Sequence, residues 1–417
     1  MVHFTRSILS NGLRVLVHED RNTPLVAVNV LYFVGSRDER PDKTGFAHLF
    51  EHLMFAGSRN APDFDEPMQR AGGENNAYTT NDYTTFYEIV PAENIETALW
   101  LESDRMLALN IHKKALDVQR RVVVEEFKES CLNEPYGDAW HHLSDLMFKV
   151  HPYRWPVIGL KPEHLENAAI EDVREFYQHW YTPNNAVLTI AGNIRTEAVL
   201  PLVEKWFGNI PAGPAPDRQL PPEPPQTALQ QRTVRADVPV PAVYLTFRTP
   251  PRLHPDFYAV DLLSDVLAQG QSSRLYRRLV KEKRLFSGID AYVTANLDPG
   301  LLIIEGKPAD GVPPEEALAA VWVELDGLKS QPIDARELAK IQHRLESTIV
   351  FSETSVLNKA QNLAFYEILK NAEWMNDEVA VYLAVTPDDL LRTAQELFRP
   401  ENAAVLTYMP QQQEPGK

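Results

Sequence analysis

The sequence predicts an α+β protein of two homologous domains, each a largely antiparallel sheet packed with helices. Strands and helices alternate in both halves of the 417-residue chain, without a Gly-rich phosphate loop. Segment 182–188 of the first half is echoed by segment 399–405 of the second. A proline-rich stretch separates the halves, and so many prolines form a stiff, extended connector. We therefore expect an N-terminal domain over 1–210, a linker over 211–226 and a C-terminal domain over 227–417.

Composition excludes several classes of protein. Hydrophobic residues at 44% and charged residues at 24% are typical of globular domains. The net charge of −17 disfavours nucleic acid as a partner and favours a basic peptide. The alternative interpretation is that the charge contributes only to solubility. A single cysteine, Cys131, excludes an internal disulfide and a thiolate metal cluster.

No apolar run approaches the ~20 residues of a membrane span. Residues 1–6 lack the basic start and apolar core of a signal peptide. We expect a cytoplasmic protein as the sequence stands, and a periplasmic one if an export signal was trimmed.

The first half begins with a hairpin over 8–19, turning at Asn11-Gly12, followed by a largely apolar strand over 25–34. A second hairpin over 72–90 is rich in Thr and Tyr around an Asn-Asp turn. Amphipathic helices are expected around a strand at 185–191, over residues 95–109, 113–132, 136–149, 170–180 and 196–207.

A short helix between the apolar strand and the second hairpin carries the most informative motif. Thr44 is an acceptable N-cap and Gly57 suits the left-handed residue that ends a helix. Within it, His48 and His52 stand one turn apart on one face, with Glu51 beside them. The order H-x-x-E-H is one of the zinc-peptidase signatures.

Two His and one carboxylate hold zinc with a fourth position left for water, and a nearby unligated Glu can take the proton of that water as it attacks a carbonyl. The motif therefore indicates peptide-bond hydrolysis. The alternative interpretation is a helix whose polar residues simply meet solvent. The surrounding apolar residues argue against this alternative, because burying unpaired polar groups among apolar side chains costs free energy. These apolar residues are Phe46, Leu49, Phe50, Leu53, Met54 and Phe55.

The second hairpin has the polar, β-prone composition of an edge strand. An edge strand beside a hydrolytic metal can bind an extended peptide through main-chain hydrogen bonds. A surface hairpin without a ligand is the alternative.

The helix over 113–132 supplies a further carboxylate. Gln119, Val122, Val123 and Glu126 are spaced i, i+3, i+4, i+7 and share one mostly apolar face. Glu125 and Glu129 point elsewhere and are interpreted as solvated charges.

The second half keeps the scaffold without the metal chemistry. When Gly57 is laid on Gly270, the motif helix aligns with a helix over 257–270, and the positions of the three motif residues are taken by Asp261, Ser264 and Asp265. We therefore expect one zinc ion per chain.

Together these motifs resemble the pitrilysin-type zinc peptidases, above all their short bacterial members and the catalytic subunit of the mitochondrial processing peptidase. The resemblance covers essentially the whole chain. It implies that His48 and His52 are zinc ligands and that Glu51 is the general base. It also implies Glu126 as third ligand, because the stretch 120–126 matches the family's segment ending in the liganding Glu.

The resemblance further implies that Asn76 and Ala77 belong to the substrate-binding edge strand. Many members carry another Glu where this chain has Gln119, which can hydrogen-bond a ligand but adds no charge. Active members usually carry an Arg and, seven residues later, a Tyr that reach the substrate. After the matching stretch 272–275, this chain has Val280 and Ser287 at those positions.

The sequence thus predicts a zinc endopeptidase acting on peptides or unfolded polypeptides in extended form, as the metal-bearing subunit of a heterodimer. The homologous partner would carry the Arg/Tyr pair, unless Arg277 or Arg278, or another alignment register, supplies it within this chain. A non-catalytic structural or assembly subunit is the alternative function. A peptide-binding module with a structural zinc is disfavoured, because such sites close all four positions with Cys or His. Manganese and cobalt fit the same ligands.

Overall fold

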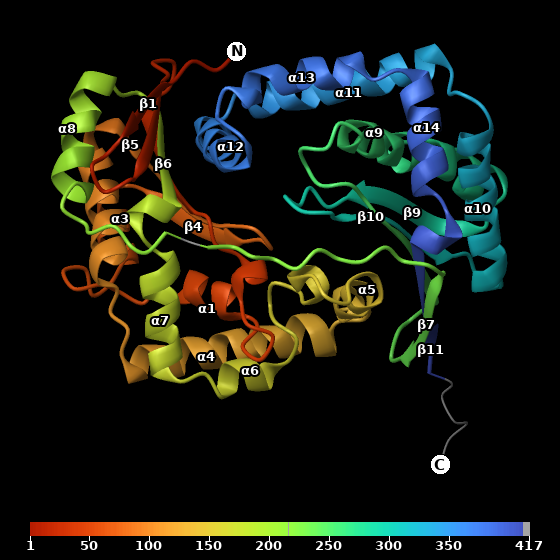
Figure 1. Cartoon of the computed structure of the whole chain (residues 1–417), viewed down its shortest axis with the longest axis horizontal. Helices are drawn as coiled ribbons and strands as arrows, with labels where there is room; N and C mark the ends of the chain where they lie inside the picture. Colours follow the sequence, from red (N-terminus) through yellow and green to blue (C-terminus); the bar gives the residue numbers. More distant parts are fainter. Residues whose placement is uncertain (216, 412–417) are drawn as a thin grey trace. The chain divides into compact units, whose positions relative to one another are not determined.

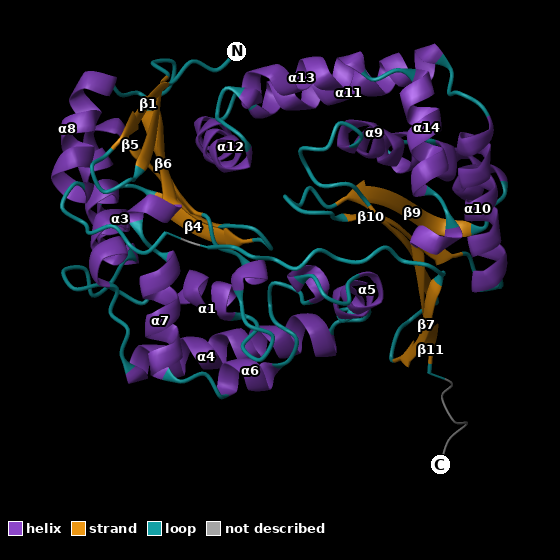
Figure 2. Ribbon diagram, in the orientation of Figure 1, coloured by secondary structure: helices purple, strands orange, loops and turns teal. Residues whose placement is uncertain are grey.

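The computed structural model describes residues 1–215 and 217–411 (Figures 1 and 2). Pro216 of the predicted linker and residues 412–417 of the predicted C-terminal domain lie outside the described residues. The chain forms two compact units that exchange segments. Unit 1 comprises Met1–Phe127, Trp155–Leu220 and Ile349–Asp377, and unit 2 comprises Lys128–Arg154, Pro221–Thr348 and Glu378–Lys417.

The sheet of unit 1 has the order β1-β2-β6-β3-β5-β4, with β4 at one edge. Its strands are β1 (Thr5–Ile8), β2 (Arg14–Glu19), β3 (Leu25–Tyr32), β4 (Glu74–Thr79), β5 (Thr84–Pro91) and β6 (Ala186–Gly192). β2 and β6 are parallel and the other neighbours antiparallel, so the predicted, largely antiparallel sheet is confirmed. The predicted hairpins are confirmed too, with Gly12 at a φ of 87° in the first turn.

Helices cover both faces of this sheet. They are α1 (Phe46–Leu53), α2 (Asp65–Arg70), α3 (Ile95–Ala108), α4 (Lys113–Phe127), α6 (Pro162–Glu166), α7 (Ile170–Trp180), α8 (Thr196–Phe207) and α12 (Val356–Leu369). α12 packs on β3 and β6 (Figure 1). Its Leu363 and Ala364 belong to one buried cluster with Leu31 and Val187. Val28 and Val30 point to the opposite face, into the main core with the α1 residues Leu49 and Phe50, because successive strand residues alternate between faces.

The sheet of unit 2 has the order β7-β11-β8-β10-β9. Its strands are β7 (Gln230–Ala236), β8 (Ala242–Arg248), β9 (Phe286–Val293), β10 (Leu301–Pro308) and β11 (Ala403–Pro410). The remaining helices of the chain are α5 (Ala139–Met147), α9 (Phe257–Ala268), α10 (Pro314–Ser330), α11 (Ala335–Ser352), α13 (Trp374–Ala384) and α14 (Pro387–Leu397). α5 packs on β8 and β11.

The predicted duplication is visible in both sheets. β7, β11, β8, β10 and β9 repeat the order and directions of β2, β6, β3, β5 and β4. Two asparagines at equivalent positions of the two halves, Asn185 and Asn402, also make equivalent hydrogen bonds. Asn185 donates to the carbonyls of Phe33 and Trp180, and Asn402 donates to those of Arg248 and Leu397. Each amide therefore ties the end of a helix to the end of a central strand.

The predicted helix over 113–132 differs from the observed one. Regular α-helix ends at Phe127, and Lys128–Asn133 continues as a π-helical turn. A helix with the length and apolar content of a membrane span is not found in the part of the chain that the structure describes.

A buried charge cluster lies in the core of unit 1. Arg105 donates from Nε to Glu102 at 3.0 Å and from Nη2 to Glu88 at 3.2 Å, and all three side chains are almost completely buried. The guanidinium also lies 4.3 Å from the ring centre of Phe64 and 4.5 Å from that of Phe86. Burial and the neighbouring Glu102 raise the pKa of Glu88. Arg105 is therefore the shared hydrogen-bond donor of two buried acidic side chains.

We expect Arg105→Met to destabilise unit 1 by about 3–5 kcal/mol, because it leaves two carboxylates buried without their cation. Urea unfolding followed by circular dichroism measures the loss. Arg70→Met is the matched control, since Arg70 forms an exposed pair with Glu66 and such pairs contribute little. Equal midpoints for the two variants would contradict the assigned role of the cluster.

Candidate metal centre

The N-terminus of helix α1 is fixed by the carboxylate of Glu39, which lies shortly before it in the chain. Gly45, not the predicted Thr44, is the N-cap residue, with a φ of 88°. The hydroxyl of Thr44 instead accepts the N–H of Leu160 at 2.8 Å. The Glu39 carboxylate takes over the capping role by accepting the N–H groups of Gly45 at 2.9 Å and Ala47 at 2.8 Å.

The C-terminal end of α1 also differs from the prediction. The regular helix ends at Leu53, and Gly57, at a φ of 99°, belongs to the turn that follows. The helix buries its apolar face: Phe46, Ala47, Leu49, Phe50 and Leu53. The motif residues remain half-buried on the other face.

His48 and His52 converge with Glu126, which α4 places against α1. The two Nε2 atoms are 3.3 Å apart. Glu126 places Oε1 3.7 Å from Nε2 of His48 and Oε2 3.4 Å from Nε2 of His52. One ligand atom from each residue lies within 4.8 Å of the others, and this is the one such His/Cys/Asp/Glu group found among the described residues.

These separations fit a tetrahedral metal ion. Ligand atoms about 2.1 Å from a tetrahedral zinc ion stand roughly 3.4 Å apart. The 3.3 Å between the two Nε2 atoms matches that value. Each Nε2 also lies 3.4–3.7 Å from a different oxygen of Glu126, and with one ligand atom per residue all three lie within 4.8 Å. Two imidazole nitrogens and one carboxylate are donors that suit zinc, and three protein ligands leave room for a fourth.

The protonation states suit a metal ligand set. Burial lowers the pKa of His48, which favours the neutral imidazole that binds metals. A hydrogen bond from His52 lowers the pKa of Glu126, which favours the carboxylate.

Glu51 lies outside this group and is held by a residue that the sequence analysis missed. Thr79, at the end of β4, donates from Oγ1 to Oε2 of Glu51 at 2.7 Å. Thr79 is half-buried, as are Ala77 and Asn75, because these alternate residues share one face of the strand. That periodicity is the sequence signal that places Thr79 on the same face, although it does not reveal the partner.

Asn76 and Ala77 lie in the middle of β4, and the predicted edge position of this strand is confirmed. The Oδ1 atom of Asn76 accepts the N–H of Ala77 at 2.8 Å. The N–H of Ala77 is therefore already bonded to a neighbouring side chain. An extended ligand that paired with this N–H would replace Asn76 as the acceptor.

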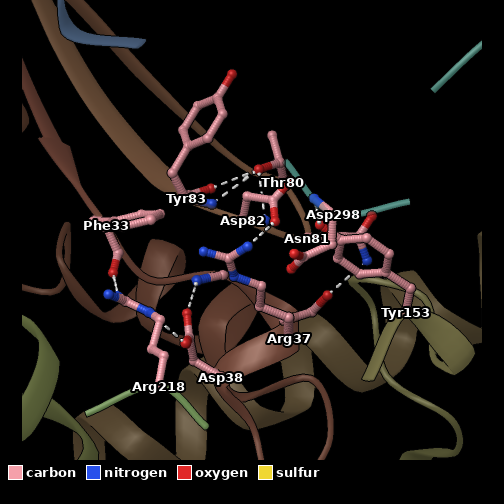
Figure 3. Close-up of polar contacts among 12 residues, drawn as sticks. Phe33, Arg37, Asp38, Thr80, Asn81, Asp82, Tyr83, Tyr153, Arg218 and Asp298 are labelled. Carbon is pink, nitrogen blue, oxygen red and sulfur yellow. Dashed lines mark hydrogen bonds and ion pairs between the residues drawn. The ribbon is translucent and has the colours of Figure 1, made fainter. Parts of the chain in front are cut away.

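A buried ion pair holds the turn that follows β4. Figure 3 shows Arg37 facing Asp82, with Nη1 and Oδ1 2.7 Å apart, and both side chains are 5% exposed. Nearby, Arg218 of the proline-rich segment donates to Asp38 at 2.8 Å and to the carbonyl of Phe33. Both contacts lie within unit 1 and fix the loop after β3 and the β4–β5 turn.

The other predicted site residues are not all brought to the group. Gln119 is half-buried on α4, seven residues before Glu126, while Glu129 is exposed and lies outside the group.

In unit 2, Val280 is half-buried, and the exposed Ser287 donates to the carbonyl of Lys307. Neighbouring arginines already have acidic partners, Arg277 with Glu282 and Arg278 with Glu324.

The corresponding helix of unit 2, α9, holds its carboxylates in protein contacts. Asp261 accepts the hydroxyl of Tyr382 at 2.6 Å, and Asp265 pairs with Arg344. Ser264 donates to the carbonyl of Asp261. The positions that carry the motif in α1 are thus occupied by a hydrogen-bonded, charge-paired cluster in α9.

Comparison with known proteins finds two family matches along the chain. Residues 14–158 match the family described as Insulinase (Peptidase family M16), and residues 167–345 match the one described as Peptidase M16 inactive domain. The chain is 29% identical over 411 residues to the zinc protease PqqE of Helicobacter pylori, covering 96% of this chain and 92% of that protein. It is 28% identical over 407 residues to the uncharacterized zinc protease YmxG of Bacillus subtilis, covering 96% and 97%.

A solved structure is also similar over the full length. The crystal structure of a protease from Helicobacter pylori superposes with a TM-score of 0.92 at 28% identity, covering 98% of this chain and all of that one. The two-unit fold of this chain is therefore shared with that protease.

We expect Glu126→Ala to lower bound zinc to well below one ion per chain, because it deletes the negatively charged member of the group. Inductively coupled plasma mass spectrometry of protein dialysed against buffered zinc measures the content. Glu129→Ala, an exposed carboxylate three residues away, is the control and keeps its zinc. The reverse outcome would show that the wrong carboxylate has been assigned.

Proposed function

Because the chain belongs to peptidase family M16, we propose that it is a zinc-dependent endopeptidase that hydrolyses peptides or unfolded polypeptides bound in extended form. The observation that carries the proposal is the convergence of His48, His52 and Glu126, whose ligand atoms lie within 4.8 Å of one another, with Glu51 on the same helix as the histidines. The names of the two relatives, both zinc proteases, support the same activity.

In this proposal, His48, His52 and Glu126 hold the zinc ion, one per chain. Zinc, when bound, polarises the peptide carbonyl and acidifies the attacking water. Glu51 would accept the proton of the attacking water, while its Oε2 atom also accepts the Thr79 hydroxyl. Gln119 supports the ligands by hydrogen bonding without adding charge.

The substrate pairs with the free edge of β4. An extended peptide satisfies main-chain N–H and C=O groups that the sheet leaves open on this strand. Asn76 releases the N–H of Ala77 when the peptide binds, so the strand exchanges one hydrogen bond for another. The net charge of −17 favours basic peptides by long-range attraction.

We further propose that the chain works as the metal-bearing subunit of a heterodimer. The family's substrate-contacting Arg and Tyr are replaced by Val280 and Ser287, and Arg277 and Arg278 have acidic partners of their own. A homologous chain that carries the pair would supply the missing contacts.

The same replacements favour a second candidate function, a non-catalytic structural, assembly or peptide-binding subunit of the same fold. Intact metal ligands and Glu51 argue for the enzyme, because a subunit without activity needs neither.

We expect Glu51→Gln to lower turnover by about 10²–10⁴-fold while zinc stays at the wild-type level, because the change removes a proton acceptor and no ligand. Cleavage of a mixed peptide library, followed by mass spectrometry, measures turnover, and wild-type protein treated with a chelator marks the background. Near-normal turnover by Glu51→Gln would refute the mechanism.

We expect the purified, zinc-loaded chain alone to cleave peptides on the order of a hundredfold more slowly than a mixture with a homologue bearing the Arg/Tyr pair. Positioning groups contribute to the barrier reduction in this range. The control is the same homologue with both residues replaced, which should give no stimulation. Full activity from the lone chain, unchanged by the partner, rules out the heterodimer. A zinc-loaded chain that stays inactive with the partner and binds peptide supports the second candidate.

A further inference from the structure

The hydroxyl of Thr79 joins the two parts of the proposed site. Thr79 ends the edge strand β4, and Glu51 lies on α1. Their side chains meet in the 2.7 Å hydrogen bond from Oγ1 to Oε2. A threonine hydroxyl has one proton to donate, so this bond commits it to Glu51.

The main chain of Thr79 faces the free edge of the sheet. The N–H of Thr80 donates to the carbonyl of Tyr83 at 2.8 Å, which closes the turn between β4 and β5. Residues of an antiparallel pair alternate between those bonded across the pair and those that are not. Thr79 and Ala77 therefore direct their main-chain groups away from β5, consistent with the N–H of Ala77 meeting Asn76.

We propose that Thr79 is a positioning residue, whose hydroxyl orients the Glu51 carboxylate and ties it to the strand that receives the substrate. This inference rests on the proposed function and adds a residue to it. A glutamate side chain has several rotatable bonds, and the hydrogen bond from the hydroxyl restricts the orientation of the carboxylate. A peptide paired with β4 steadies the backbone from which the hydroxyl projects.

Thr79→Val tests the hydroxyl, because valine keeps the β-branched shape that suits a strand. Thr79→Ser is the matched control, since it keeps the hydroxyl and loses only a methyl group. Both variants are compared with wild type in the presence of the partner homologue, after thermal melting and zinc content confirm folded, loaded protein. We expect Thr79→Val to lower kcat about ten- to a hundredfold with KM changed less than about threefold, and Thr79→Ser to restore most of kcat.

A second readout does not depend on activity. In crystal structures of the zinc-loaded variants, we expect the Glu51 carboxylate to occupy one position in wild type and Thr79→Ser, and more than one in Thr79→Val. Wild-type kcat in Thr79→Val, or an unmoved Glu51 in its structure, overturns the inference.

The two proposals fail in different ways. If Glu51→Gln retains turnover, the proposed mechanism fails, whatever Thr79 does. If Glu51→Gln is inactive while Thr79→Val matches wild type, only the role of Thr79 fails.

Discussion

The site depends on the hydrogen bonds between the Glu39 carboxylate and the first N–H groups of α1. Glu39 is 6% exposed, and this burial raises the pKa of its carboxyl group well above the usual range. The hydrogen bonds from the N–H groups of Gly45 and Ala47 act in the opposite direction and favour the charged form. The contact fixes where α1 begins and how it is rotated. With Leu49 and Phe50 in the core, His48 and His52 are then presented to α4, and Glu51 to β4. A helix of eight residues has little stability of its own, so it needs such an anchor.

In the duplicated scaffold, the one candidate metal group found among the described residues lies in the first half. Both halves build the same five-strand order, and Asn185 and Asn402 make the same helix-to-strand contacts. The difference lies in a few side chains of the equivalent helices. In α9 the carboxylates of Asp261 and Asp265 are matched by Tyr382 and Arg344, so their charge and hydrogen bonding are satisfied by the protein itself.

Local sequence patterns predicted α3, α7, α8 and α9, both hairpins and the edge position of β4, because period and turn chemistry are local properties. They failed where the deciding partner is distant in the chain. Thr44 looked like a helix cap, but its hydroxyl binds Leu160, 116 residues away. Thr79 acts through Glu51, 28 residues away. Glu39 is the exception, because the N–H groups that it accepts are only six and eight residues further along the chain. The exchange of α5 and α12 between compact units likewise leaves no local signal. The predicted domain boundaries and the ligand roles of the motif residues stay predictions.

The central claim is that His48, His52 and Glu126 form a single zinc site. Anomalous X-ray diffraction at the zinc edge, on crystals of zinc-loaded protein, tests it most directly. The account predicts one strong peak per chain, bonded to Nε2 of both histidines and to the Glu126 carboxylate at about 2.0–2.2 Å. A peak at Asp261 and Asp265, or none between the two histidines, would contradict it.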